Sequence, residues 1–172
     1  MGRLTVAILP LRAPWILLAA VALAYSSAFL GVFQFDDYNV VVGNPAVTNW
    51  PPDSSGLRPL LKLSYALNWS VGDAPIGFHL FNVLVHWLNA VLVLMLGQRL
   101  SSHYLPENAA RHAALVGALL FALHPVHTEA VTYISGRSSS LMTCFYLASL
   151  LAYDRGRVLD HRGWLWVTSP LL

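Results

Sequence analysis

The stretch IGFHLFNVLVHWLNAVLVLMLG, residues 76–97, carries no charged side chain and decides the fold. At about 1.5 Å per residue, a helix of this length crosses the roughly 30 Å hydrocarbon core of a bilayer. The rest of the chain agrees: 56% of its residues are hydrophobic and 10% are charged, whereas soluble domains carry about 25% charged residues. We therefore expect an all-α protein whose solvent is largely lipid.

Further apolar runs lie on both sides of this stretch. Residues 13–35 predict a first span, residues 113–134 a third span that breaks at His124-Pro125 and continues as a short outer helix, and residues 139–153 a short fourth span. A fifth run, residues 164–172, reaches the end of the chain and indicates truncation. A cleaved signal peptide is the alternative for the first run, but its apolar core would be only about 7–15 residues long. The sequence predicts a polytopic bundle of about four spans plus the start of a fifth.

The distribution of arginine and lysine over the loops predicts the orientation, because cytoplasmic loops are richer in these residues. With the N-terminus in the cytoplasm, the inner and outer segments hold seven and three such residues. The inner residues are Arg3, Arg12, Arg99, Arg111, Arg155, Arg157 and Arg162, and the outer ones are Arg58, Lys62 and Arg137. Residues 36–75 and 124–138 are then expected on the same outer or lumenal face.

The first outer loop, residues 36–75, has two different halves. Its first half is rich in turn-forming residues, such as Asn44-Pro45 and Pro51-Pro52. Its second half predicts an amphipathic helix in the membrane interface. That helix would run from Arg58 to Trp69, with Leu57, Leu60, Leu61, Tyr65 and Leu67 on an apolar side and Arg58 and Lys62 on a polar side.

Two adjacent acids, Asp36 and Asp37, directly follow the first predicted span. Carboxylates are unfavourable at the C-terminus of a helix, because the helix dipole is negative there. A water-facing helix cap is the structural interpretation. An aspartate at this boundary can instead act as a general base toward an acceptor hydroxyl.

Polar residues elsewhere on the predicted outer face and in the second span have structural and functional interpretations. The segment His124 to Glu129 provides metal-ligand types, but not with the His-Glu-x-x-His spacing, so a hydrogen-bonded helix break is the simpler interpretation. Arg137 could hold a phosphate or extend from a span end toward water. A stripe on one face of the second span predicts hydrogen bonds between helices; it comprises His79, Asn82, His86 and Asn89.

Taken in order, these motifs resemble a known family over roughly residues 35–153. The order is Phe35-Asp36-Asp37, Asn44-Pro45, Arg58-Pro59-Leu60, Gly77-Phe78-His79-Leu80-Phe81-Asn82, His86, the segment 124–131 (HPVHTEAV) and Gly136-Arg137. The pattern resembles the N-terminal membrane region of the transmembrane and tetratricopeptide-repeat O-mannosyltransferases and their bacterial relatives. It is more distantly similar to protein O-mannosyltransferases, and all of these are GT-C membrane glycosyltransferases.

The resemblance implies transfer of a sugar, mannose or a similar one, from a polyprenyl-phosphate donor to a protein or glycan hydroxyl on the outer face, with inversion. It implies Asp36 as the catalytic base and Asp37 as a second catalytic acid that arranges the site. Arg137 and Arg58 are the candidate residues for the donor phosphate. His124, His127 and Glu129 are expected to line the active face. The sequence departs from the family at Ser139, where relatives often carry an acid.

Two rival classes remain at this point, a transporter and a membrane anchor without catalysis. A transporter would place acids near the middle of the bilayer, not at its edge. We expect membrane lipid, the lipid-linked sugar and an acceptor as partners, no nucleic acid and no cofactor, and we assign no metal ligand. The expected location is the bacterial inner membrane, or the endoplasmic reticulum membrane in a eukaryote, with a cytoplasmic N-terminus.

Overall fold

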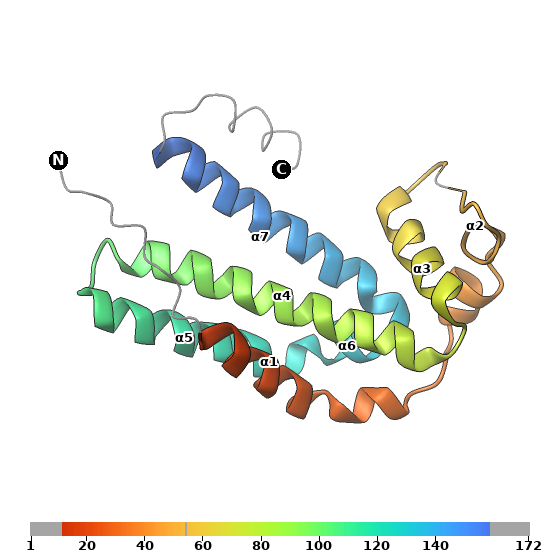
Figure 1. The fold of residues 1–172 in the computed structure, drawn as a ribbon, viewed down its shortest axis with the longest axis horizontal. Helices are drawn as coiled ribbons and strands as arrows, with labels where there is room; N and C mark the ends of the chain where they lie inside the picture. Colours follow the sequence, from red (N-terminus) through yellow and green to blue (C-terminus); the bar gives the residue numbers. More distant parts are fainter. Residues whose placement is uncertain (1–11, 54, 159–172) are drawn as a thin grey trace. The chain divides into compact units, whose positions relative to one another are not determined.

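A computed structural model describes residues 12–53 and 55–158. Every regular element in these ranges is helical (Figure 1). The longer helices are α1 (Ala13–Ala24), α3 (Pro59–Val71), α4 (Pro75–Ser101), α5 (Glu107–Leu123) and α7 (Arg137–Val158). The short ones are η1 (Ser26–Leu30), the π-helix η2 (Tyr38–Val42), α2 (Pro45–Thr48), η3 (Pro125–His127), α6 (Thr128–Thr132) and η4 (Ile134–Gly136). The all-α prediction is confirmed for this part of the chain.

The predicted number of spans, about four plus the start of a fifth, is wrong for the described residues, which hold one or two candidates. Among the described residues, α4 alone is long and apolar enough to cross a membrane, and α5 with residues 125–132 forms a second candidate only if the bent pair counts as one span. The bend between these two segments is 47°. It falls at the predicted His124-Pro125 break, where proline cannot continue the hydrogen bonding of α5. The predicted fifth span, residues 164–172, lies outside the described residues.

The continuous helix predicted for residues 13–35 is wrong, because α1 ends at Ala24 and η1 follows. The Ser26 hydroxyl donates to the Leu23 carbonyl at 3.0 Å, a local bond of the kind that competes with helical hydrogen bonding. Gly31 then adopts an extended conformation. The predicted fourth span is part of α7, which is longer than residues 139–153. Its serines at the start and its charged last turn make it too polar to qualify as a span.

The chain divides into two compact units. The described parts of unit 1 are residues 12–21, 87–123 and 143–158, and those of unit 2 are residues 22–53, 55–86 and 124–142. The helix α4 therefore contributes its first half to unit 2 and its second half to unit 1.

Unit 1 is built on close helix packing. In α5 the buried residues are alanines at every fourth position: Ala110, Ala114, Ala118 and Ala122. A Cβ added to Gly97 of α4 would lie 3.4 Å from Ala114, so small side chains let these two helices approach closely. The Trp87 indole donates to the Pro14 carbonyl at 2.9 Å, which attaches α1 to α4.

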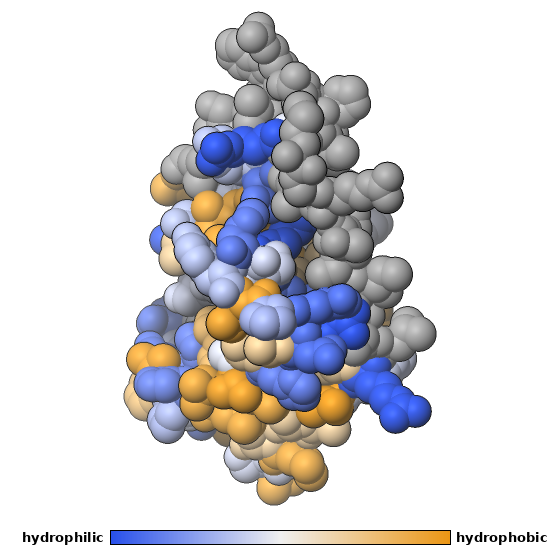
Figure 2. Space-filling model, turned by 90° about the vertical axis from the view of Figure 1, so that its left-hand side faces the viewer, coloured by the Kyte–Doolittle hydropathy of each residue, from blue (hydrophilic) through white to orange (hydrophobic). Residues whose placement is uncertain are grey.

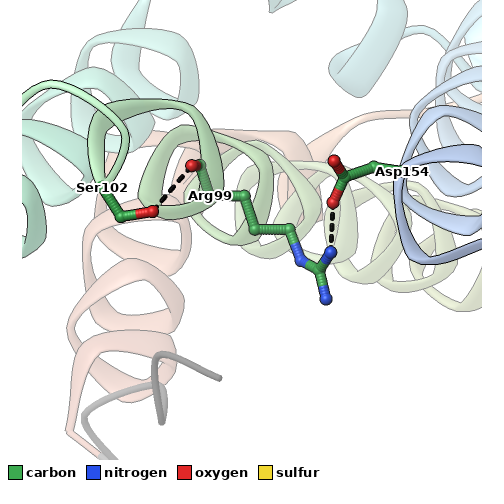
Figure 3. A network of polar contacts seen from close by, with 3 residues as sticks. All are labelled: Arg99, Ser102 and Asp154. Carbon is green, nitrogen blue, oxygen red and sulfur yellow. Dashed lines mark hydrogen bonds and ion pairs between the residues drawn. The ribbon is translucent and has the colours of Figure 1, made fainter. Parts of the chain in front are cut away.

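An ion pair joins α4 and α7 in the same unit. Figure 3 shows the Arg99 side chain of α4 extending to the carboxylate of Asp154 on α7. The Ser102 hydroxyl donates to the Arg99 carbonyl at 2.8 Å and completes the network. Both charged side chains are partly exposed, so we assign this pair a structural role and a modest energy.

Unit 2 has its own apolar core, formed mainly by residues from the first loop and the start of α4. Here α2 packs against α3 (Figure 1). The buried core residues are Val41, Val47, Tyr65, Phe78 and Ile134, with Phe33, Val40, Leu61 and Trp69 packed against them. Two rings of this core contact the guanidinium of Arg137, whose carbon lies 4.4 Å from the ring centre of Tyr65 and 5.6 Å from that of Phe78.

The helix predicted for the second half of the loop is present as α3, but its faces differ from the prediction. Tyr65 is buried and Leu61 packs against the core, whereas Leu60 and Leu67 are 57% and 48% exposed. The apolar residues of α3 therefore lie on two faces and not on one. One face packs against the core of unit 2, and the other faces outward. Leu63 and Val71 extend the outward stripe. Orange patches of apolar residues also reach the surface beside polar ones on the face drawn in Figure 2.

Candidate functional site

The two adjacent acids have opposite environments. The Asp37 side chain is buried, with 1% of the residue exposed. One of its carboxylate oxygens accepts from the Gln34 backbone N–H at 3.0 Å. The other accepts from the Ser135 backbone N–H at 2.8 Å and from the Ser135 hydroxyl at 2.5 Å. Asp37 thus ties the turn after η1 to the loop before α7, and its carboxylate is already occupied by protein donors.

Asp36 is exposed, and its carboxylate makes no hydrogen bond with the described residues. Its backbone is nevertheless fixed. The Asp36 N–H donates to the Tyr133 hydroxyl at 2.9 Å, and its carbonyl accepts from the N–H groups of Asn39 and Val40. The preceding residue, Phe35, has a φ of +43°, which is unusual for a bulky side chain and is typical of strained functional turns. The turn thus holds the backbone of Asp36 in place while its carboxylate stays free.

Arg137 is completely buried, and its donors are directed to protein oxygens. Its Nε donates to the Asn82 side-chain oxygen at 2.8 Å, and its two terminal nitrogens reach the Ser64 carbonyl at 3.0 Å and the Phe78 carbonyl at 3.2 Å. The guanidinium carbon lies 4.4 Å from the ring centre of Tyr65 and 4.3 Å from that of Phe81. Such a cation–π cage compensates in part for the lost hydration of the charge.

The same residues hold the segment that precedes Arg137. The Asn82 amide donates to the Tyr133 carbonyl at 3.1 Å, and the Tyr65 hydroxyl donates to the Ile134 carbonyl at 3.1 Å. Burial raises the pKa of Tyr65 to about 12, so this phenol keeps its proton at neutral pH and remains a donor. Asn82 lies on α4, so for this residue the predicted bonding between helices is confirmed.

Gly136 permits a close approach of two backbone segments. A Cβ at this position would lie 2.5 Å from the Glu129 carbonyl oxygen and 3.0 Å from the Ala130 Cα. No side chain larger than hydrogen fits there without a backbone shift. The Gly-Arg motif therefore has a structural explanation. Gly136 allows the close backbone packing, and Arg137 provides the buried guanidinium.

Arg58 stands apart from this hydrogen-bonded network. It is exposed and precedes α3 with φ 58° and ψ 53°, in the left-handed region. Its side chain forms no hydrogen bond and no ion pair with the residues that the structure describes. Its guanidinium is therefore available to an external anion, whereas that of Arg137 is enclosed.

The predicted active-face residues lie on the break between α5 and α6. His127 is partly buried and lies 5.3 Å from His86 and 6.3 Å from His124, measured between ring centres. Nδ1 of His124 accepts from the Val126 N–H at 3.2 Å, which caps η3. Glu129 is exposed. Among the described residues, no three His, Cys, Asp or Glu side chains are placed to hold a metal ion.

The structure adds Tyr133 and Ser135 to the candidate site, and the sequence analysis missed both. Ser135 contacts Asp37 and Tyr133 contacts Asp36, although each pair is about a hundred positions apart in the sequence. The one signal that could have indicated them is their position directly before Gly136-Arg137.

Comparison with known proteins identifies relatives of the chain. No protein-family model and no solved structure matches it. It is 35% identical to the human protein O-mannosyl-transferase TMTC4 over 75% of its own length and 21% of that protein. It is 36% identical to mouse TMTC1 over 86% of its length and 17% of that protein, and 30% identical to a protein O-mannosyl-transferase of Caenorhabditis elegans over 84% and 23%.

By these similarities, the chain is grouped with the protein O-mannosyl-transferases. Within that class, the chain is similar over most of its length to the TMTC proteins. The resemblance to the transmembrane and tetratricopeptide-repeat O-mannosyltransferases, predicted from the ordered motifs, is confirmed. The chain spans about a fifth of the length of these curated relatives.

Proposed function

We propose that the protein containing this chain is a GT-C membrane glycosyltransferase. It transfers mannose, or a similar sugar, from a polyprenyl-phosphate donor to a hydroxyl of a protein or glycan on the outer or lumenal face. The relatives are named protein O-mannosyl-transferases, which supports a mannosyl transfer to protein. The single structural observation that carries the proposal is the free, exposed carboxylate of Asp36 beside the fully bonded carboxylate of Asp37.

Asp36 acts as the general base in this proposal. The acceptor oxygen attacks the anomeric carbon while its proton passes to the Asp36 carboxylate. The bond from that carbon to the phosphate oxygen breaks, and the electron pair leaves with the polyprenyl phosphate. A base must offer an accessible lone pair to the reacting hydroxyl. Asp36 offers one, whereas the oxygens of Asp37 already accept three hydrogen bonds from Gln34 and Ser135.

Asp37 and Arg137 position the site. Asp37 fixes the turn that carries Asp36, and Arg137 organises the loop that Asp37 binds. The sequence also proposed Arg137 for the donor phosphate. Its complete burial and its bonds to Asn82, Ser64 and Phe78 favour a supporting role in this conformation.

Arg58 is the better candidate for the donor phosphate, because its guanidinium is exposed and a planar fork of donors suits a phosphate. It directly precedes α3, whose outward leucines suit contact with lipid. A donor whose polyprenyl tail lies in the bilayer would present its phosphate at this level. His124, His127 and Glu129 are proposed to line the same outer face.

The proposed function is tested by sugar transfer with the intact protein in its membrane. The donor is a polyprenyl-phosphate mannose, and turnover is normalised to correctly inserted protein. Asp36→Asn should lower the rate by about 10²–10⁴-fold, the usual cost of losing a general base. Asp73→Asn is the matched control, because Asp73 is an exposed acid in the same loop, and it should behave as wild type.

Two outcomes contradict the proposal at different levels. If Asp36→Asn keeps more than about a tenth of the wild-type rate, the loss is smaller than removal of a general base usually causes, and Asp36 is not the base. If inserted wild-type protein transfers no sugar from any polyprenyl-phosphate donor, the glycosyltransferase assignment is wrong.

A further inference from the structure

We propose that the hydroxyl of Tyr133 donates a hydrogen bond to a backbone carbonyl of a peptide acceptor, next to the serine or threonine that Asp36 deprotonates. This inference rests on the proposed function and adds an acceptor-binding residue to it. The observation behind it is the position of the phenol oxygen, 2.9 Å from the Asp36 backbone nitrogen.

The hydroxyl hydrogen of Tyr133 is available to a substrate. The phenol oxygen accepts from the Asp36 N–H, so its own hydrogen must point to a different partner. No described residue accepts that hydrogen, and the side chain is only partly buried. Tyr65 shows the contrasting case, since its hydroxyl donates to the Ile134 carbonyl. Because the hydroxyl is partly exposed and only its oxygen is engaged, its hydrogen can be donated to solvent or to a ligand.

The phenol is held in place before any substrate arrives. The Tyr133 carbonyl accepts from the Asn82 amide at 3.1 Å, and its N–H donates to the Glu129 carbonyl at 3.2 Å. Asn82 is itself fixed by Arg137 at 2.8 Å. A donor that is already oriented binds a substrate without the cost of ordering a side chain.

The chemistry of the acceptor provides the matching group. A serine or threonine within a peptide has a backbone carbonyl on each side, and neither carbonyl takes part in the reaction. Asp36 must contact the hydroxyl itself, so a donor fixed beside Asp36 reaches the neighbouring backbone. Because such a bond is equally strong before and during the reaction, it should affect the KM of the peptide and not kcat.

The test uses the full-length protein in its membrane, a polyprenyl-phosphate mannose donor and three serine peptides. One peptide is unmodified, and two carry a thioamide, a weaker acceptor, in place of the carbonyl before or after the serine. Tyr133→Phe should raise the KM of the unmodified peptide about 3- to 10-fold, the range for one neutral hydrogen bond. The kcat and the KM of the donor should stay within about twofold. Tyr104→Phe is the matched control, because Tyr104 is 87% exposed in a loop of unit 1.

The thioamide peptides separate a substrate contact from a purely structural role. Wild type should bind one of the two thioamide peptides more weakly, and Tyr133→Phe should lose that discrimination. A variant that merely loosens Asp36 would lower kcat and keep the discrimination, which would overturn the inference. An active wild type that treats all three peptides alike would also overturn it, whether or not Tyr133→Phe folds. An inactive wild type would instead contradict the proposed function, and this inference with it.

Discussion

The carboxylate of Asp37 accepts two hydrogen bonds from Ser135, one from its backbone N–H at 2.8 Å and one from its hydroxyl at 2.5 Å. The two residues are 98 positions apart. Their contact joins the turn that carries Asp36 to the loop that leads into α7. Hydrogen bonds to a buried charge are about twice as strong as neutral ones, so this contact is a main support of the candidate site.

We expect Asp37→Asn to destabilise the protein by about 2–4 kcal/mol, because an amide group would face donors that now meet a carboxylate. Ser135→Ala should cost less, about 1–3 kcal/mol, since the backbone N–H still donates. Denaturant unfolding in detergent measures both effects. Asp36→Asn is the control and should leave stability unchanged. Equal losses for Asp36→Asn and Asp37→Asn would contradict the division of roles between the two acids.

Local sequence signals correctly predicted the features of the fold that depend on local physics. The uncharged run 76–97 lies within α4, and the proline at position 125 ends α5 where expected. The end of α1 was missed, because an apolar run can form one helix or two. At the break, the Ser26 hydroxyl donates to the Leu23 carbonyl, a local contact that hydropathy does not report.

The candidate site was predicted as a set of residues but not as an arrangement. Two adjacent acids look equivalent in a sequence, yet one is buried and the other exposed. Likewise, the position of Arg137 after Gly136 suggests an anion site or a span end. Its burial depends on rings from α3 and α4, which lie more than fifty positions away. Contacts over such separations have no local pattern.

Gly136→Ala should destabilise the protein by about 1–3 kcal/mol, because its Cβ would overlap the Glu129 carbonyl unless the backbone moves. Gly77→Ala is the matched control. A Cβ at Gly77 of α4 meets no atom within 4 Å, and alanine favours a helix, so stability should hold or rise slightly. Thermal unfolding of the two variants in the same detergent compares them directly. If Gly136→Ala is as stable as Gly77→Ala, the close approach at this position is not essential.

Stability should fall between about pH 10 and pH 12 in a way that depends on Tyr65. An unfolded tyrosine has a pKa near 10, whereas burial raises that of Tyr65 to about 12. The folded state therefore holds this proton more tightly. Its contribution is fully present below pH 10 and is lost as the pH rises toward 12. The melting temperature of Tyr65→Phe should decline less over this interval than that of wild type. If the melting temperatures of the two proteins fall in parallel over this interval, folding does not change the pKa of Tyr65.

The predicted topology can be tested by cysteine labelling in a background where Cys144 is replaced by alanine. From the arginine and lysine bias, Pro45→Cys should react with a membrane-impermeant reagent added outside, and Leu105→Cys only after the membrane is opened. Both positions are at least partly exposed in their loops, so access by the reagent is decided by the membrane. The reverse pattern would place Asp36 on the cytoplasmic face and exclude transfer on the outer side.

Arg137 and Arg58 should respond differently to substitution. Arg137→Lys replaces a planar fork that bonds Asn82, Ser64 and Phe78 with a single ammonium group. We expect a loss of about 2–4 kcal/mol in unfolding free energy, since buried acceptors lose their partner. Arg58→Lys is the matched control and should leave stability unchanged, because that side chain is exposed.

The kinetic readout separates support from phosphate binding. In the full-length protein, Arg58→Ala should raise the KM of the polyprenyl-phosphate donor about tenfold or more, the cost of one charge-assisted contact. Its melting temperature should match that of wild type. If Arg137→Lys instead keeps normal stability and raises the donor KM, while Arg58→Ala changes neither quantity, then Arg137 binds the phosphate in a conformation that exposes its guanidinium.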